Sequence, residues 1–157
     1  MNDNPSDEPN AKILFSTEYD DDSADVETLW AYDLGNDRYR IDNLPYFAYG
    51  VSWNDVVYAP FNADEQRAAY VKVLEKSGNR TIRIIFEEPI DENAESMALL
   101  DRLTKIGCDF ENANGILVVI NIPATVDLFE AAELIENTGV TWEYADPTYE
   151  EIFGDDE

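Results

Sequence analysis

Apolar and polar residues alternate through most of the first half of the chain, which is the pattern of strands that bury only one face. Gly35 and Asn36 mark a hairpin turn, and Pro45 interrupts extended structure. The region around Tyr70 and Val71 fits a helix or a strand, but its β-branched and aromatic residues favour a strand. The predicted strands cover residues 12–19, 26–34, 38–41, 51–58 and 68–76. Short strands at this density indicate a small β-barrel or a strongly bent antiparallel sheet, in a subdomain over residues 11–79.

The pattern changes to a helical period after Arg80. Residues 81–86 form a β-branched run typical of a strand. Apolar residues at helical spacing follow over residues 93–106, and Gly107 stands where a C-cap is expected. The apolar positions of this predicted helix are Met97, Leu100, Leu103 and Ile106.

A hairpin, a second helix and a final strand complete the pattern. The predicted elements are strands at 108–112 and 116–122 on either side of an Asn114-Gly115 turn, a helix between a cap at Thr125 or Asp127 and Gly139, and a strand at 140–145. The resulting order β-α-β-β-α-β is that of ferredoxin-like folds. The sequence therefore predicts an α+β chain with a ferredoxin-like βαββαβ subdomain over residues 80–146.

Acidic residues greatly outnumber basic ones, and they are unevenly distributed. The chain has 35 Asp and Glu against 10 Lys and Arg, no histidine, and a net charge of −25. Residues 1–25 carry 8 acids and 1 base, residues 26–83 carry 8 and 7, and residues 84–157 carry 19 and 2, giving −7, −1 and −17. Uneven charge indicates a partner more than a fold. High-salt adaptation is the alternative, but it should charge the near-neutral middle as well.

The charge and the ends of the chain exclude several classes of function. Lys and Arg are needed to displace counterions from phosphates, so we expect no direct contact with nucleic acid, and anionic membrane surfaces are disfavoured for the same reason. No apolar run approaches the roughly 18 to 20 residues of a membrane span. The first residues lack the features of a signal peptide, and the single cysteine leaves no internal disulfide. We therefore expect a cytoplasmic protein.

Both ends of the chain differ from its centre. Residues 1–10 are rich in Asn, Asp, Pro and Ser, which predicts a disordered leader. Residues 147–157 form an acidic tail that also carries Tyr149, Ile152 and Phe153. Large apolar side chains beside carboxylates suit insertion into a basic cleft. The alternative is that Ile152 and Phe153 pack back onto the sheet.

Several short strings occur together and in order along the chain. They are Leu29-Trp30-Ala31, Tyr39-Arg40-Ile41-Asp42-Asn43-Leu44-Pro45-Tyr46-Phe47, Asp55-Val56-Val57, and Ser77-Gly78-Asn79 followed by Thr81 and Arg83. With the βαββαβ run that follows, the chain resembles a bacterial family catalogued as domain of unknown function 4265, over about residues 12–145. The family name records no assigned activity, so the resemblance implies no site residues. The acidic tail lies outside it.

Patterns for catalysis and metal binding are largely missing. Without histidine the chain lacks the commonest general base, the Ser-His and Cys-His nucleophile arrangements and the commonest metal ligand. Cys108 is therefore expected to fill the core, and Trp30 and Trp142, which lie in apolar strands, are expected to be buried. The run Asp20–Asp25 lacks the Gly and Glu positions of an EF-hand, and no Gly-rich phosphate loop follows a strand. We expect no catalytic residues, no metal site and no cofactor.

Carboxylates could still act as an acid–base pair. The adjacent Glu87 and Glu88 are available, as are Asp109 and Glu111, but chance alone produces such pairs among so many acids. If Glu87 and Glu88 extend the preceding strand, they point to opposite faces and form no pair. A solvated acidic face is the better interpretation.

The favoured hypothesis is a non-catalytic immunity or inhibitor protein that occludes the active site of a basic bacterial toxin domain. Complementary charge accelerates such an encounter. The expected partner-binding residues are Glu87, Glu88, Asp91, Glu92, Glu95, Tyr149, Glu150, Glu151, Ile152 and Phe153. The alternative is a ligand-sensing regulatory module of ferredoxin-like type, and an enzyme is the third hypothesis.

Overall fold

In the computed structural model, the chain divides into two compact units, Met1–Ser77 and Gly78–Glu157. The structure describes residues 9–154. Residues 1–8 of the predicted disordered leader and residues 155–157 of the predicted tail lie outside this range. Asn10 lies within it, and its N–H donates a hydrogen bond to the carbonyl of Ala31 at 3.1 Å. The helices found in residues 9–154 are too short or too polar to cross a bilayer.

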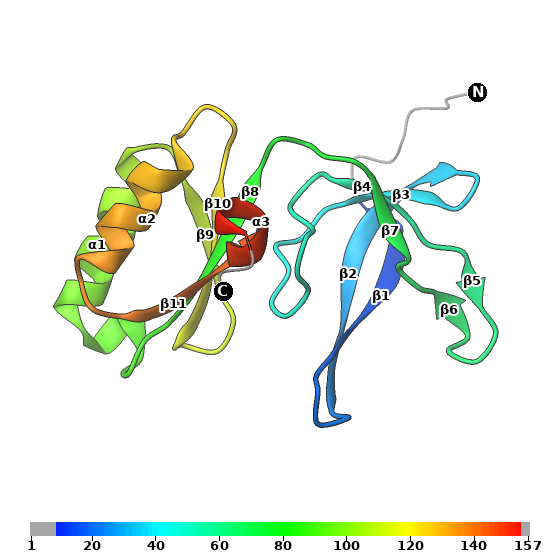
Figure 1. Ribbon diagram of the computed structural model, residues 1–157, viewed down its shortest axis with the longest axis horizontal. Helices are drawn as coiled ribbons and strands as arrows, with labels where there is room; N and C mark the ends of the chain where they lie inside the picture. Colours follow the sequence, from blue (N-terminus) through cyan, green and yellow to red (C-terminus); the bar gives the residue numbers. More distant parts are fainter. Residues whose placement is uncertain (1–8, 155–157) are drawn as a thin grey trace. The chain divides into compact units, whose positions relative to one another are not determined.

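The N-terminal unit is built on a five-stranded antiparallel sheet (Figure 1). Its strands are β1 (Ala11–Glu18), β2 (Ala24–Gly35), β3 (Arg38–Ile41), β4 (Val56–Tyr58) and β7 (Lys72–Glu75). They lie in the order β1-β2-β3-β4-β7. A separate two-stranded sheet joins β5 (Phe61–Asn62) to β6 (Arg67–Ala68). Neither β5 nor the break between β6 and β7 was predicted from the sequence.

The five-stranded sheet is open, with β1 and β7 at its edges. A barrel would require its two edge strands to pair with each other. Within residues 9–154, the bridge that β1 forms beyond β2 is a single parallel one between Leu14 and Ala69. The barrel alternative is therefore wrong, and the unit contains open antiparallel sheets.

The strand predicted over residues 51–58 is shorter than expected, because its first half forms a turn. Asp55 accepts a hydrogen bond from the N–H of Ser52 at 2.8 Å. Asn54 has a φ of 71°, in the left-handed region that a strand does not contain. Local bonds from side chain to backbone compete with sheet pairing, and β4 consequently begins only at Val56.

The alternation of β2 decides which of its side chains enter the N-terminal core. Leu29 and Ala31 are 3% and 0% exposed, whereas Trp30 between them is 42% exposed. The expectation that Trp30 is buried is therefore wrong. Lys12 lies directly across the strand pair and places its Nζ 4.7 Å from the centroid of the Trp30 ring. The ammonium group thus partly covers the exposed ring.

The C-terminal unit combines a four-stranded antiparallel sheet with helices (Figure 1). Its strands are β8 (Arg80–Ile85), β9 (Asp109–Asn112), β10 (Leu117–Ile122) and β11 (Thr141–Asp146), in the order β11-β8-β10-β9. Its helices are the short 3-10 helix η1 (Ile90–Glu92), α1 (Ala94–Lys105), α2 (Leu128–Glu136) and α3 (Tyr149–Phe153). Figure 1 shows α1 and α2 side by side on one face of this sheet. The chain as a whole is α+β.

One apolar core joins α1 and α2 to the sheet. Its fully buried members include Ile82, Ile84, Ile120, Ile122, Leu99, Leu103 and Ile135. Burying one such side chain contributes about 1.5 to 3 kcal/mol. Asp127, rather than Thr125, caps α2 by accepting the N–H of Phe129 at 2.9 Å. Gly107 ends α1 with a φ of 115°, as the sequence predicted.

Candidate binding surfaces of the C-terminal unit

A pocket of about 290 Å³ opens where β8 ends, α1 begins and α2 leads into β11. Three predicted partner-binding acids, Glu87, Glu88 and Glu95, line it, and all three are exposed. We call this site the acidic pocket. Its other lining residues are Ile85, Phe86, Asn93, Ser96, Leu99, Thr138, Gly139, Val140 and Thr141.

Glu87 and Glu88 both line the acidic pocket, although alternation along a strand would point them to opposite faces. β8 ends at Ile85, so neither glutamate belongs to the strand. The extension of the strand on which that expectation depended does not occur. Two neighbouring carboxylates therefore share one site.

Asn93 organises the mouth of the acidic pocket through both ends of its side-chain amide. Its Oδ1 accepts the N–H groups of Glu95 and Ser96 at 2.9 and 3.1 Å, which caps α1. Its Nδ2 donates to Oε1 of Glu88 at 3.0 Å. One residue thus fixes the start of the helix and the direction of one pocket carboxylate.

The buried part of the lining is mostly apolar. Phe86 and Leu99 are 3% and 0% exposed, and Ser96, one turn before Leu99 on α1, is 7% exposed. The lining includes neither Lys nor Arg. The accessible surface of the acidic pocket is therefore mainly polar, and Phe86 and Leu99 lie beneath it.

Asp91 and Glu92 do not line the acidic pocket. They lie on η1, between Glu88 and α1, and both are exposed. Ile90, which precedes them, is buried in the core and anchors this short helix. The two carboxylates add negative charge near the pocket without bordering it.

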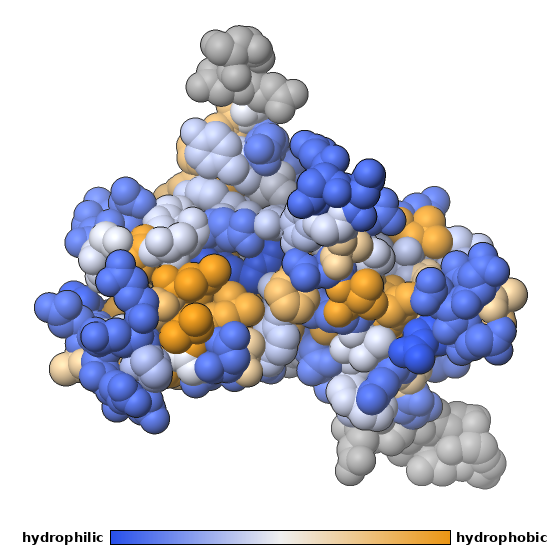
Figure 2. All heavy atoms as spheres, turned by 90° about the horizontal axis from the view of Figure 1, so that it is seen from below, coloured by the Kyte–Doolittle hydropathy of each residue, from blue (hydrophilic) through white to orange (hydrophobic). Residues whose placement is uncertain are grey.

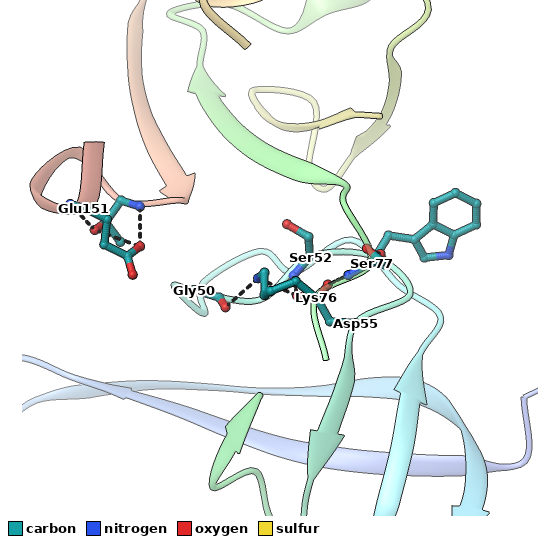
Figure 3. Close-up of polar contacts among 8 residues, drawn as sticks. Gly50, Ser52, Asp55, Lys76, Ser77 and Glu151 are labelled. Atoms are coloured by element: carbon teal, nitrogen blue, oxygen red, sulfur yellow. Dashed lines mark hydrogen bonds and ion pairs between the residues drawn. The ribbon is translucent and has the colours of Figure 1, made fainter. Parts of the chain in front are cut away.

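The first residues of the predicted acidic tail form the short helix α3. Thr148 caps it in a capping box with Glu151, whose Oε1 accepts the N–H of Thr148 at 2.9 Å (Figure 3). Ile152 is partly buried and packs against the core of the unit. Phe153 is 54% exposed. Of the two residues that the alternative expected to pack back, only Ile152 joins the core.

Aromatic side chains gather where α3 meets β11 and the first turn of α2. They form a set of neighbouring rings that we call the aromatic patch, made of Phe129, Trp142, Tyr144, Tyr149 and Phe153. The ring centroids of Tyr149 and Phe153 are 4.7 Å apart, and those of Phe129 and Phe153 are 6.3 Å apart. Phe129, Tyr149 and Phe153 are more than half exposed, and Glu150 beside them is exposed. Figure 2 shows hydrophobic residues gathered in patches among hydrophilic ones on the face that it displays.

Tyr144 is the most enclosed phenol of the aromatic patch. Burial raises its pKa, and the neighbouring Tyr149 and Glu136 act in the same direction. Its ring lies 4.9 Å from that of Trp142, edge to face. Trp142 is partly buried and its Nε1 donates to Glu136 at 2.8 Å. Tyr144 therefore stays a neutral phenol at neutral pH.

The acidic pocket and the aromatic patch both include residues of β11, with Thr141 in the pocket and Trp142 and Tyr144 in the patch. In the antiparallel register of β8 and β11, Thr141 of the pocket faces Ile85, and Asp146, just before α3, faces Thr81. Four to five residues of strand span roughly 15 Å. The predicted partner-binding residues thus form two groups, each with its own chemistry.

Cys108 and the acidic turn at Asp20–Asp25 have structural surroundings. The predicted burial of Cys108 is confirmed at 2% exposed, and burial, with Asp109 nearby, raises the pKa of its thiol to about 11. The hydroxyl and N–H of Ser23 both donate to Asp21, which lowers the pKa of that carboxyl. Among residues 9–154, no three His, Cys, Asp or Glu side chains are grouped so as to hold a metal ion.

A family model described as "Domain of unknown function (DUF4265)" matches residues 27–144, which is three quarters of the chain. The chain belongs to this family. The resemblance expected from the sequence is confirmed. The DUF4265 match includes the acidic pocket and ends within β11, so α3 lies beyond it.

The DUF4265 strings have structural roles in the N-terminal unit. Asn43 accepts the N–H of Trp30 at 2.6 Å, and Asp42 accepts Nε1 of Trp53 at 3.1 Å. Asp55 is fully buried and holds the ends of two segments together. These contacts stabilise the fold.

The DUF4265 chain is also similar to a solved structure of a hypothetical protein from Neisseria gonorrhoeae. The two sequences are 15% identical, the match covers 88% of this chain and 96% of the other, and the TM-score is 0.74. At this identity the similarity shows the fold alone. No curated protein matches the chain.

Two kinds of residue at these surfaces were not predicted from the sequence. Ser96 and Asn93 line the acidic pocket beside the glutamates, and the signal available for them was the cap three residues before a buried serine. Phe129 and Tyr144 complete the aromatic patch. No local pattern connects them to Phe153, because the three lie on separate elements that only the tertiary structure brings together.

Proposed function

We propose that this DUF4265 chain is a non-catalytic acidic binding protein of the bacterial cytoplasm, specifically an immunity or inhibitor protein that occludes the active site of a basic toxin domain. The observation that carries the proposal is the concentration of charge in the C-terminal unit. Residues 84–157 hold 19 acids against 2 bases, whereas residues 26–83 hold 8 against 7. A field of one sign on one unit steers a partner of the opposite sign toward it.

We further propose that the C-terminal unit is of the ferredoxin-like type. The strand order β11-β8-β10-β9, with antiparallel pairing and with α1 and α2 in the two crossovers, supports this assignment. Such a unit places its connecting segments at the two ends of the sheet. The acidic pocket lies at one end of the β8–β11 pair, and α3 follows the other end of β11.

The two surfaces supply different parts of a binding interface. Half-exposed aromatic rings such as Tyr149 and Phe153 are the residues that most often dominate binding energy when a partner buries them. The carboxylates of the acidic pocket and of η1 supply orientation and speed of association. On a toxin domain that acts on an anionic substrate, the basic cleft is the complementary surface.

Capture from the producing bacterium tests this proposal. The tagged full chain should retain one basic protein, and the Kd of the purified pair should weaken at least tenfold between about 0.05 and 0.5 M NaCl, because salt screens the charges. The chain should also abolish the toxic activity of that protein. No retained basic protein, or a Kd that does not change with salt, would contradict the proposal.

Matched charge variants locate the interface. Glu87→Gln with Glu88→Gln and Glu95→Gln removes three charges from the acidic pocket, and Asp64→Asn with Glu65→Gln and Glu75→Gln removes three from exposed positions of the N-terminal unit. The first variant should weaken the Kd strongly and the second only slightly. The reverse result would place the interface on the N-terminal unit.

A ligand-sensing regulatory module is the second candidate, and the acidic pocket is the observation that favours it. Its volume of about 290 Å³ is at the lower end of the range for small-molecule sites. This candidate requires a metabolite that raises the Tm of the protein by binding the folded state. A screen of metabolites by thermal unfolding distinguishes it from the immunity hypothesis.

A further inference from the structure

We infer that one face of the five-stranded sheet in the N-terminal unit binds an acidic peptide segment of a partner protein. The inference goes beyond the proposed function, which concerns a basic partner. The face lies opposite the apolar core of the unit. We call it the cationic face, and it is defined by Lys12, Trp30, Tyr32, Arg38, Arg40 and Lys72.

The strands β1, β2 and β3 place two cations beside two aromatic rings. Lys12 of β1 lies opposite Trp30 of β2, and Arg40 of β3 lies opposite Tyr32 of β2. Residues opposite each other in antiparallel strands share a face, as do residues two apart on one strand. The four side chains therefore lie on one face, whereas Leu29, the neighbour of Trp30, enters the core.

The other half of the sheet adds two more cations to the same face. Arg38 lies two residues before Arg40 on β3. Across the sheet, Tyr58 of β4 lies opposite both Arg38 and Lys72 of β7. The guanidinium of Arg38 donates to backbone carbonyls of the neighbouring hairpin at 3.2 Å, so its position is fixed while its charge remains.

Acidic side chains are scarce on the cationic face. In the register of the five strands, the acids on this face are Glu18, at the far end of β1, and Glu75, on the edge strand β7. The sequence as a whole has 35 acids against 10 bases. The charge of this face is therefore opposite to that of the chain.

The cations of this face contact rings instead of carboxylates. Within residues 9–154, Nζ of Lys12 lies 4.7 Å from the centroid of the Trp30 ring, and Cζ of Arg40 lies 4.5 Å from that of Tyr32. A ring has no net charge, so each cation keeps its own.

The guanidinium of Arg40 lacks a hydrogen-bond acceptor in the described part of the chain. Its Nε is buried and unpartnered, although buried donors are normally paired. A carboxylate presents two oxygens that match the planar fork of a guanidinium group. Arg40 is therefore the position at which an acidic side chain of a partner gains most.

The arrangement of the rings favours a peptide over a nucleic acid. Single-stranded nucleic acids bind by stacking bases on open aromatic rings. A cation already lies over the ring of Trp30 and over that of Tyr32, so less ring surface is open to a base. An acidic peptide carries separate carboxylates for the cations, and its apolar side chains can cover Trp30, which is 42% exposed.

The net charge of −25 does not prevent this binding at moderate salt. At about 0.15 M ionic strength, exposed charges separated by more than about 8 Å are largely screened from each other. A carboxylate in contact with Arg40 is therefore governed by the charges next to it. A nucleic acid, with its closely spaced phosphates, brings many more charges into the repulsive field of the chain.

Titration of the labelled full chain with three probes tests the inference. The probes are acetyl-Asp-Glu-Leu-Asp-Glu-amide, the basic peptide acetyl-Lys-Lys-Leu-Lys-Lys-amide and a short oligothymidylate. The amide NMR signals of Trp30, Tyr32 and Arg40 should shift and saturate with the acidic peptide at up to about 20 mM, the range of millimolar affinity. No saturable shift with this peptide, or equal shifts with the basic one, would overturn the inference. Tighter binding of the oligothymidylate would assign the face to nucleic acid and overturn it as well.

Variants tie the binding to the cationic face. Arg40→Gln should weaken the Kd of the acidic peptide about tenfold, since hydrogen bonds between charged groups are lost. Arg67→Gln removes the same charge from an exposed position of β6, in the separate two-stranded sheet, and is the matched control. Equal weakening by the two variants would show that the peptide binds the general field and would overturn the site.

A second variant guards against a folding defect, because Arg40 is partly buried. Lys12→Gln with Lys72→Gln removes two charges from exposed side chains and should weaken the Kd by a similar factor without disturbing the core. A dispersed spectrum confirms that each variant is folded. An unchanged Kd in this folded double variant would contradict the inference.

Discussion

The buried carboxylate of Asp55 lies 2.6 Å from the Nζ of Lys76, and the same carboxylate accepts the N–H groups of Ser52 and Ser77 at 2.8 and 2.7 Å (Figure 3). Asp55 is 0% exposed, while the side chain of Lys76 is 47% exposed. The carboxylate therefore ties the turn before β4 to the end of β7. Without it, the N–H groups of Ser52 and Ser77 would lose this acceptor.

Asp55→Ala should be among the most destabilising single changes in the N-terminal unit. It removes the acceptor of the buried N–H of Ser52 and of the N–H of Ser77, together with one ion pair, so we expect a loss of about 2 to 4 kcal/mol in the free energy of unfolding. Urea unfolding followed by tryptophan fluorescence measures it. The control Asp64→Asn changes an exposed acid in the turn between β5 and β6 and should leave the midpoint nearly unchanged. Equal midpoints for the two variants would refute the structural role of Asp55.

Glu27 should hold the loop at residues 46–48 in place. Its Oε1 accepts the N–H of Tyr46, and its Oε2 accepts those of Phe47 and Ala48, each at 2.9 Å. Glu27→Ala should accelerate hydrogen exchange at these three amides by at least about tenfold, because local opening no longer breaks charged hydrogen bonds. Glu18→Ala, on the exposed end of β1, is the control. Unchanged protection in the Glu27 variant would contradict this role.

The thiol of Cys108 should be unreactive in the native protein. Burial raises its pKa from 9.0 to about 11, so the thiolate that reacts is scarce at neutral pH. Modification by 5,5′-dithiobis(2-nitrobenzoate) at pH 8 should therefore be slow in the folded chain and fast in urea. Rapid modification of the folded chain would contradict the burial.

The same shift makes the contribution of Cys108 to stability depend on pH. The unfolded thiol loses its proton near pH 9 and the folded thiol only near pH 11, so the contribution is fully present below pH 9 and is lost as the pH rises toward 11. In the Cys108→Ala variant the free energy of unfolding should lack this decrease between pH 9 and pH 11. The difference in unfolding midpoint between the variant and the parent chain, measured from pH 8 to pH 10.5, should therefore shrink as the pH rises. A constant difference would mean that the thiol is not perturbed by folding.

The two apolar residues at the end of α3 should respond differently to truncation. Ile152→Ala removes a side chain that packs on the core, so we expect a loss of about 1 kcal/mol in the free energy of unfolding. Phe153→Ala removes a ring that is 54% exposed and should change stability by less than about 0.5 kcal/mol while weakening partner binding. Thermal unfolding of both variants measures the difference. A larger destabilisation by Phe153→Ala would assign that ring to the fold instead of to an interface.

The sequence predicted the elements that have strong local signals. The helical spacing of Met97, Leu100 and Leu103 and the glycine after it placed α1 within one or two residues of its observed bounds. α3 was missed because five residues carry no periodicity, although Thr148 and Glu151 hold the spacing of a capping box. Local sequence signals of this kind can locate the end of a helix, but they do not show which residues will share a surface.

The candidate site required tertiary information. Glu87 and Glu95 were both expected to bind a partner, but only the end of β8 at Ile85 brings them to one pocket. Trp30 was expected to be buried from the apolar character of its neighbours, and alternation along β2 places it outside. The hydrophobic composition of a strand indicates how much apolar surface it can bury, whereas its register determines which side chains are buried.

The two basic residues of residues 84–157, Arg102 and Lys105, both lie in the last turn of α1, and Glu95 lies in its first turn. Negative charge near the N-terminus and positive charge near the C-terminus interact favourably with the helix dipole, so this arrangement stabilises α1. It also gives the unit a potential that changes along one axis. A cationic molecule near α1 experiences a torque as well as an attraction, so its approach is oriented before contact is made.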